Sequence, residues 1–121
     1  MTWLAVAVGA VLGAPLRDLI HRAVAKRTER AGARPFPWGL LVVNGAGSAA
    51  AGVVLASTTG DLRILLITGF CATFTTFSGF VWEADRLRPA ARASFWWAVL
   101  VMPGVCITAF MVAWRVTETL V

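Results

Sequence analysis

The side chains in this sequence that can act on a ligand are neutral and gather in two places. One is Asn44, which stands among small residues, and the other is the run from residue 73 to residue 78, which holds three threonines and a serine. Phe77 and Phe80 are three residues apart and share a face if the segment is helical. The edge of an aromatic ring is electropositive. Ring edges, hydroxyls and the Asn44 amide therefore predict a route along which a small anion loses its water gradually, with no fixed positive charge to trap it.

Both groups also have simpler interpretations. A lone asparagine inside an apolar helix often forms a hydrogen bond to a neighbouring helix, and such a bond contributes about 0.6–2 kcal/mol. A pair of phenylalanines at helical spacing usually packs against lipid or against other side chains. The sequence by itself leaves these alternatives open.

The elements that carry these residues are apolar and long. The chain has 121 residues, of which 59% are hydrophobic and 14% are charged, and its mean hydropathy is +0.77. Because a membrane-spanning helix needs roughly 20 apolar residues, the sequence predicts an all-α membrane protein with four transmembrane helices in one domain. The expected spans are residues 3–20, 38–57, 64–82 and 95–114, and the six tryptophans lie at or near their ends, as is typical of the headgroup region.

The apolar cores of these spans contain no Asp, Glu, Lys, Arg or His. Proton-coupled carriers need an ionisable group inside the membrane, and enzymes need acid, base or nucleophile groups in proximity. The sequence therefore argues against both classes, and we expect a protein that is not an enzyme. Cys71 and Cys106 lie within spans without partners at ligand spacing, so neither a disulfide framework nor a zinc site is expected.

The third span has a composition that favours a break in its helix. Between Gly69 and Phe80 it combines glycines, β-branched threonines and a serine near the expected middle of the membrane. Irregular backbone at that depth is tolerated only where it is buried in protein or lines a cavity. Carbonyl groups freed by a break can coordinate a small hard cation.

The basic residues are distributed asymmetrically between the loops. Nine of them lie in or next to two segments, residues 21–37 before the second span and residues 83–94 after the third span. The other two, Arg63 and Arg115, lie at the opposite ends of the spans. By the positive-inside rule, both segments are expected in the cytoplasm and both termini outside. The net charge of +5 is therefore interpreted as an orientation signal and not as a nucleic-acid surface.

Three motifs in this order resemble the Fluc (CrcB) family of fluoride channels over nearly the whole chain. They are the stretch from Gly9 to Arg17, the stretch from Asn44 to Ser48, and Thr75-Thr76-Phe77-Ser78-Gly79-Phe80. The resemblance implies an antiparallel dimer in the cell membrane, with two fluoride pores at the subunit interface and a structural sodium ion on its two-fold axis.

The resemblance also implies roles for individual residues. Asn44 would supply the pore amide, Phe77 and Phe80 the ring edges, and Ser78 a hydroxyl of the pathway. Sodium would be held by the main-chain carbonyls of Ala72 and Thr75, and Arg17 would lie near an aqueous vestibule, where it raises the local anion concentration. In the fourth span, Thr108 is the one interior hydroxyl and is expected on the pathway.

The sequence departs from the family pattern at two places. Ala72-Thr73 replaces the usual pair of glycines at the helix break, and Gly79 replaces the usual threonine. The basic asymmetry also opposes insertion in both orientations, as a homodimer requires. We therefore expect a passive fluoride channel subunit that pairs with an oppositely biased homologue. The alternatives are a non-conducting structural subunit of such a pair and a small membrane-assembly protein.

Overall fold

The computed structural model describes residues 2–121, most of which are helical. The helices, in chain order, are α1 (Thr2–Arg30), α2 (Trp38–Ser57), α3 (Gly60–Ile64), the π-helix η1 (Leu65–Cys71), α4 (Ala72–Phe74), α5 (Phe77–Ala90) and α6 (Arg92–Leu120). α3, η1, α4 and α5 follow one another along the third apolar stretch.

Four helical segments are long and apolar enough to cross a membrane. They are Thr2–Arg30, Trp38–Ser57, Gly60–Ala90 and Arg92–Leu120. The prediction of an all-helical chain with four spanning helices is confirmed.

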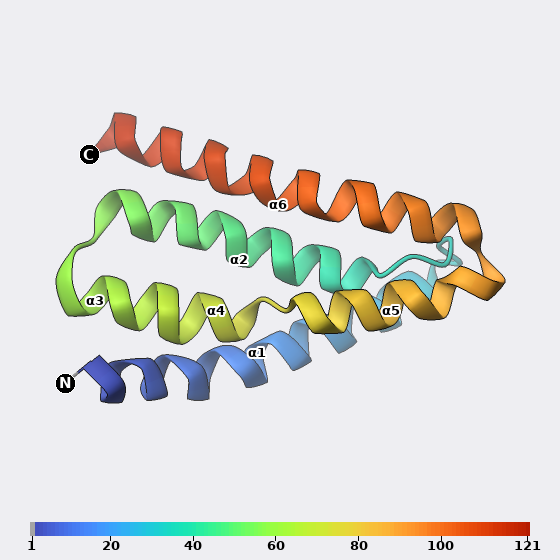
Figure 1. Cartoon of the computed structure of the whole chain (residues 1–121), viewed down its shortest axis with the longest axis horizontal. Coiled ribbons are helices and arrows are strands. Elements are labelled where there is room, and N and C mark those ends of the chain that lie inside the picture. Colours follow the sequence, from blue (N-terminus) through green and yellow to red (C-terminus); the bar gives the residue numbers. More distant parts are fainter. Residues whose placement is uncertain (1) are drawn as a thin grey trace.

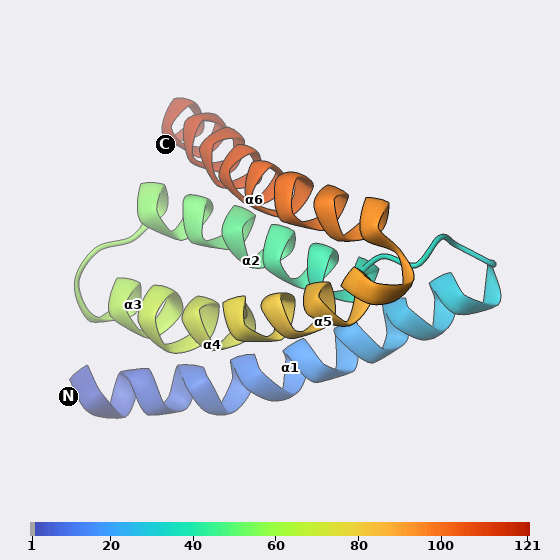
Figure 2. The same cartoon turned by 45° about the vertical axis from the view of Figure 1, so that its right-hand side comes forward.

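The four segments form a bundle in which the chain reverses direction at each connection (Figure 1). α6 packs mainly on α2, and α1 packs mainly on η1 and α2. Turning the molecule keeps the same order, with α2 and the third segment between α6 and α1 (Figure 2). The first residues of α1 and the last residues of α6 lie at the end where α2 connects to α3. The basic segments lie at the other end (Figure 1).

Two of the connecting segments are more helical than the sequence analysis expected. α1 continues through residues 21–30 to Arg30, and α5 continues to Ala90. Residues 21–30 contain no glycine or proline and many good helix formers, so the helix extends beyond the apolar stretch. It ends where Gly32 adopts a positive φ of 66°. There the amides of Gly32 and Ala33 bond back to the carbonyls of Glu29 and Thr28, which is the hydrogen-bond pattern of a glycine-terminated helix.

The helices approach one another closely where glycines replace side chains. A Cβ atom at Gly9 would lie 2.5 Å from the Leu65 carbonyl oxygen and 2.7 Å from the Gly69 Cα, and one at Gly52 would lie 2.5 Å from the Phe110 carbonyl oxygen. These atoms belong to backbone and cannot rotate away. The Gly9 contact therefore fixes α1 against η1, and the Gly52 contact fixes α2 against α6.

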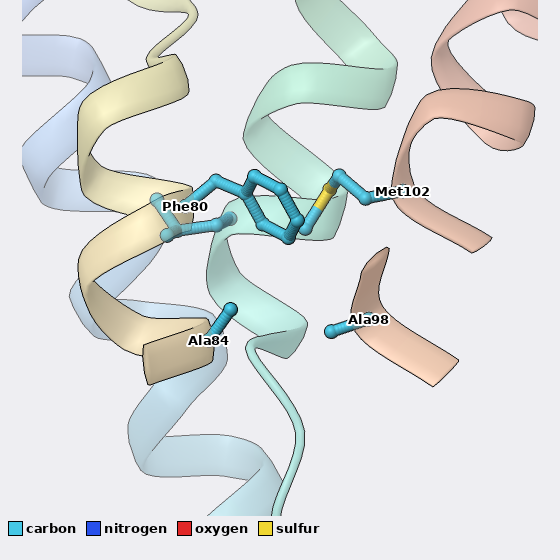
Figure 3. Packing of buried hydrophobic residues seen from close by; sticks show 5 residues of the cluster. Phe80, Ala84, Ala98 and Met102 are labelled. Carbon is cyan, nitrogen blue, oxygen red and sulfur yellow. The ribbon is translucent and has the colours of Figure 1, made fainter. Parts of the chain in front are cut away.

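The main cluster of buried apolar side chains is small and lies between α2, α5 and α6. It consists of Leu40, Phe80, Ala84, Ala98 and Met102, and Val43, Cys71 and Phe74 are buried outside this cluster. Phe80 and Met102 point toward each other from α5 and α6, and Ala84 faces Ala98 nearby (Figure 3). Most other large apolar side chains are exposed, for example Trp3 at 87% and Leu120 at 80%. An outer surface of this kind is stable in lipid and not in water.

The glycine contacts can be tested with a matched pair of substitutions. Gly9→Ala forces α1 away from the η1 backbone, and we expect a loss of about 1–3 kcal/mol. Gly45→Ala adds the same methyl group at an ordinary van der Waals distance of 3.4 Å from the Val105 side chain, and we expect little change. The measurement is thermal unfolding of the purified protein in detergent. Equal midpoints for the two variants would contradict the close approach of α1.

Candidate functional site

The third apolar segment contains two residues with extended backbone between α4 and α5. Thr75 has φ −80° and ψ 158°, and Thr76 has φ −150° and ψ 123°. The flanking residues are helical on both sides. The regular i to i+4 hydrogen bonds are therefore interrupted here, and the backbone groups of this segment need other partners.

Asn44 of α2 supplies these partners. Its Oδ1 accepts a hydrogen bond from the Thr76 amide at 2.8 Å, and its Nδ2 donates to the Thr76 carbonyl at 3.0 Å. The same Nδ2 lies 4.0 Å from the Met102 sulfur, and Asn44 is 7% exposed. One buried amide thus satisfies both backbone groups of Thr76, so the interhelical bond that the sequence left open as an alternative is present.

A groove of about 260 Å³ lies beside this contact. Among the residues expected on an anion pathway, it brings together Asn44, Phe77 and Phe80. Phe80 is buried at 6% and Phe77 is exposed at 78%. Their ring centres are 6.1 Å apart and the rings are tilted by 55°. The groove is also lined by Ser48, Thr75, Thr76, Met102, Pro103 and Cys106. The lining therefore carries hydroxyls, an amide, ring atoms and thiol or thioether sulfur, and no carboxylate or basic group.

The structure does not bring Ser78 and Thr108 into this groove. Ser78 is exposed, and its Oγ lies 3.5 Å from the Thr76 Oγ1. Thr108 lines a different hollow, between α2 and α6. The α6 residues that line the groove beside Asn44 are Met102, Pro103 and Cys106. Residues two apart on a helix point about 200° apart, so Thr108 lies on another face of α6.

Sequence reasoning also missed several lining residues. Ser48 could have been found, because it stands one turn after Asn44 on the same face of α2. Met102 and Cys106 could not, because their position depends on how α6 packs against α2.

The carbonyls of Ala72 and Thr75 have lost their usual helical donors. In an unbroken helix, the Thr76 amide would bond to Ala72 and the Gly79 amide to Thr75. The Thr76 amide instead donates to Asn44, and the Gly79 amide donates to the Thr76 Oγ1 at 3.2 Å. Neutral carbonyl oxygens are suitable ligands for a hard monovalent cation. In residues 2–121, no group of three His, Cys, Asp or Glu side chains is placed to hold a metal.

Arg17 contacts the same broken segment from α1. Its Nη1 donates to the Thr73 carbonyl at 3.1 Å in a partly buried position. This guanidinium bonds to the last turn of α4, and its place near an aqueous vestibule stays a prediction. A cation is stabilised there because the final carbonyls of a helix carry partial negative charge.

The contact between Asn44 and Thr76 can be tested by removing the amide. Asn44→Ala leaves the buried amide and carbonyl of Thr76 without partners, so we expect a loss of roughly 2–4 kcal/mol in stability. Ser48→Ala changes the same groove without touching the broken segment and should have little effect. The measurement is unfolding in mixed micelles for both variants. An Asn44→Ala protein as stable as Ser48→Ala would show that the amide does not hold the break.

Comparison with known proteins agrees with the motifs. The family model described as "CrcB-like protein, Camphor Resistance (CrcB)" matches residues 4–115. "Fluoride-specific ion channel FluC 1" of Nocardia farcinica is 47% identical over 83 residues, which cover 68% of this chain and 56% of that protein. The chain thus spans little more than half of that relative's length.

Other relatives match over more of their length. "Fluoride-specific ion channel FluC 1" of Geobacillus kaustophilus is 38% identical over 80% of this chain and 77% of the relative. "Fluoride-specific ion channel FluC" of Solibacter usitatus is 32% identical over 94% of this chain and 93% of the relative. The resemblance seen in the three motifs is confirmed, and the chain is a multi-pass membrane protein that belongs to the CrcB family.

Proposed function

We propose that this chain is a subunit of a passive, fluoride-selective channel through which fluoride leaves the cytoplasm. The observation that carries the proposal is the groove at the broken helix, where the Asn44 amide and the rings of Phe77 and Phe80 meet without any charged side chain. The curated relatives are named fluoride-specific ion channels, and they are not enzymes.

The chemistry of the groove suits a small, strongly hydrated anion. Ring edges and hydroxyl groups each offer weak positive charge, so they replace hydration water in several small steps. A fixed cation would bind the anion tightly and slow its release, whereas conduction requires weak binding at several sites. In this proposal, Phe77 and Phe80 supply the ring edges, and Thr75, Thr76 and Ser48 supply hydroxyls. Ser78 and Thr108 act only where a second subunit brings them close to the route.

We also assign a structural sodium ion to the broken segment. The carbonyls of Ala72 and Thr75 would hold it, because both lack their helical donors. Neither position needs to be glycine for its carbonyl oxygen to reach the ion. The ion would fix the backbone of the break together with Asn44. It takes no part in transport.

A single chain leaves the groove open on one side. Phe77 is 78% exposed at the edge of the groove. A second subunit would close the pathway, and we propose an antiparallel arrangement. The basic segments 21–37 and 83–94 would face the cytoplasm and both termini the outside. Of the two basic residues at the opposite end, Arg63 bonds to the carbonyls of Thr58 and Leu55. The unequal distribution of basic residues between the two ends of the bundle favours one orientation of the chain in the membrane. An antiparallel partner would therefore be a homologue with the opposite distribution.

The role of the aromatic rings is tested by fluoride efflux from liposomes. Phe77→Leu and Phe80→Leu keep apolar bulk and remove the ring edges, so we expect each to lower efflux at least about tenfold, which corresponds to roughly 1.4 kcal/mol in the barrier. Phe95→Leu, outside the groove, should conduct like the wild type. If all three variants conduct alike, the rings do not form the route. If this chain conducts together with an oppositely biased homologue, and Phe77→Leu and Phe80→Leu leave that efflux unchanged, the chain is a non-conducting structural subunit.

The composition of the dimer is tested in the same assay. The chain alone should give little efflux, and co-reconstitution with an oppositely biased homologue should restore it. An antiparallel dimer of the chain alone that passes fluoride would contradict the heterodimer. Absence of flux with every partner would instead favour a membrane-assembly protein.

A further inference from the structure

A separate hollow of about 420 Å³ lies at the basic end of the bundle. It is formed by the last part of α1, residues 33–39 and α5, and it shares no lining residue with the groove at Asn44. Pockets that hold small ligands commonly measure about 300–1,000 Å³. The hollow is therefore large enough for a small polar group, and the fluoride route does not use it.

The lining of this hollow carries two acidic and two basic side chains, namely Glu29, Glu83, Arg34 and Arg86. The Glu83 Oε1 lies 2.9 Å from the His21 Nε2. Within residues 2–121, Glu29, Arg34 and Arg86 form no ion pair within 4.0 Å. Charges of both signs thus line one hollow in equal number, and most of them are not paired directly with one another.

Contacts among the three elements hold the walls of the hollow in place. The contact between His21 and Glu83 joins α1 to α5. The start of α2 packs closely on α1, because a Cβ atom at Gly39 would lie 2.7 Å from the His21 carbonyl oxygen. The Trp38 Nε1 donates to the Arg34 carbonyl at 3.1 Å, which ties down the connecting segment. The backbone that carries the charges is therefore ordered before a ligand binds, and this lowers the entropic cost of binding.

The hollow lies at the level where the apolar spans meet charged residues. Trp38, the first residue of α2, is part of its lining. On α5, the Arg86 guanidinium lies 4.7 Å from the centre of the Trp82 ring. Tryptophan rings favour the headgroup level of a bilayer. The polar groups most concentrated around this hollow in a membrane are therefore the headgroups of lipids.

We propose that this hollow binds the headgroup of phosphatidylethanolamine, a phospholipid that carries both a phosphate and a primary ammonium. The phosphate oxygens accept hydrogen bonds from Arg34 and Arg86, whose planar guanidinium groups suit phosphate. The ammonium has three N–H donors, and the carboxylates of Glu29 and Glu83 accept from it. The bound lipid bridges α1, the connecting segment and α5, and its binding is independent of the proposed fluoride route.

The balanced charge of the lining distinguishes this headgroup from other common ones. The headgroup of phosphatidylglycerol has no cation, so its phosphate would lie beside two carboxylates without compensating their charge. The choline group of phosphatidylcholine is a cation without an N–H donor, so it cannot form hydrogen bonds to Glu29 and Glu83. A site with only basic side chains would instead favour the anionic lipid.

The test is lipid binding to the purified protein in detergent, measured by native mass spectrometry and by thermal unfolding. Phosphatidylethanolamine should bind about tenfold more tightly than phosphatidylcholine with the same acyl chains, the effect of about one hydrogen bond to a charged group. It should also raise the unfolding midpoint more than phosphatidylcholine or phosphatidylglycerol does. Glycerophosphoethanolamine, the headgroup without acyl chains, should bind more weakly than the lipid, because the chains keep the headgroup close to the bundle.

Substitutions in the lining separate the two halves of the headgroup. Glu29→Gln removes a charged acceptor and should abolish most of the preference for phosphatidylethanolamine over phosphatidylcholine. Arg34→Gln should weaken the binding of both lipids alike, because both carry the phosphate. Asp85→Asn on α5 and Lys26→Gln on α1 change charges outside the lining and should bind lipids as the wild type does.

Several outcomes would overturn the proposal. Equal binding of phosphatidylethanolamine and phosphatidylcholine by the wild type would do so, and so would a Glu29→Gln variant that keeps the full preference. Phosphatidylglycerol that binds as tightly as phosphatidylethanolamine would indicate a general anion site instead. Glycerophosphoethanolamine that binds as tightly as the lipid would indicate a site for a soluble zwitterion. If a variant does not fold, the comparison of the three lipids on the wild type still decides.

Discussion

The pair of hydrogen bonds between Asn44 and Thr76 is the interaction on which the rest of the site depends. Inside an apolar segment, an extended backbone is stable only if its polar groups find partners, and one buried amide provides both. With the Thr76 amide held by Asn44, the Ala72 carbonyl is free of its helical donor. α5 then starts at Phe77, with the Thr76 side chain accepting from Gly79. One contact between α2 and the broken segment therefore determines where Phe77 and Phe80 lie. The same contact leaves the carbonyls of Ala72 and Thr75 without their helical donors.

Close helix packing supports that contact from both sides. Gly9 lets α1 reach the backbone of η1, and Gly52 lets α2 reach the backbone of α6. Arg17 then bonds to the last turn of α4. The result is a neutral groove beside the contact between Asn44 and Thr76. A neutral lining suits an anion route, because weak contacts allow anions to leave again.

Composition and local pattern were sufficient to predict the helices, and motif order was sufficient to predict the family. The same reasoning grouped Asn44 with Phe77 and Phe80, which line one groove. It could not predict features that depend on helix rotation or on long-range pairing. Thr108 was chosen as the one interior hydroxyl of its span and lines a different hollow, whereas the α6 residues that line the groove are Met102, Pro103 and Cys106. Residues 21–30 were expected as a loop because they are polar, although their helix propensity is high. The contact between His21 and Glu83 links residues far apart in sequence, and nothing in the local pattern indicates it.

The central claim is that this neutral groove conducts fluoride in preference to other halides. The most direct measurement is the reversal potential of a planar bilayer that contains the protein, with its partner where one is needed, and has fluoride on one side and chloride on the other. We predict a current whose reversal potential follows the fluoride gradient, with negligible chloride current. A reversal potential near zero under these conditions, or a chloride current comparable to the fluoride current, would contradict the account.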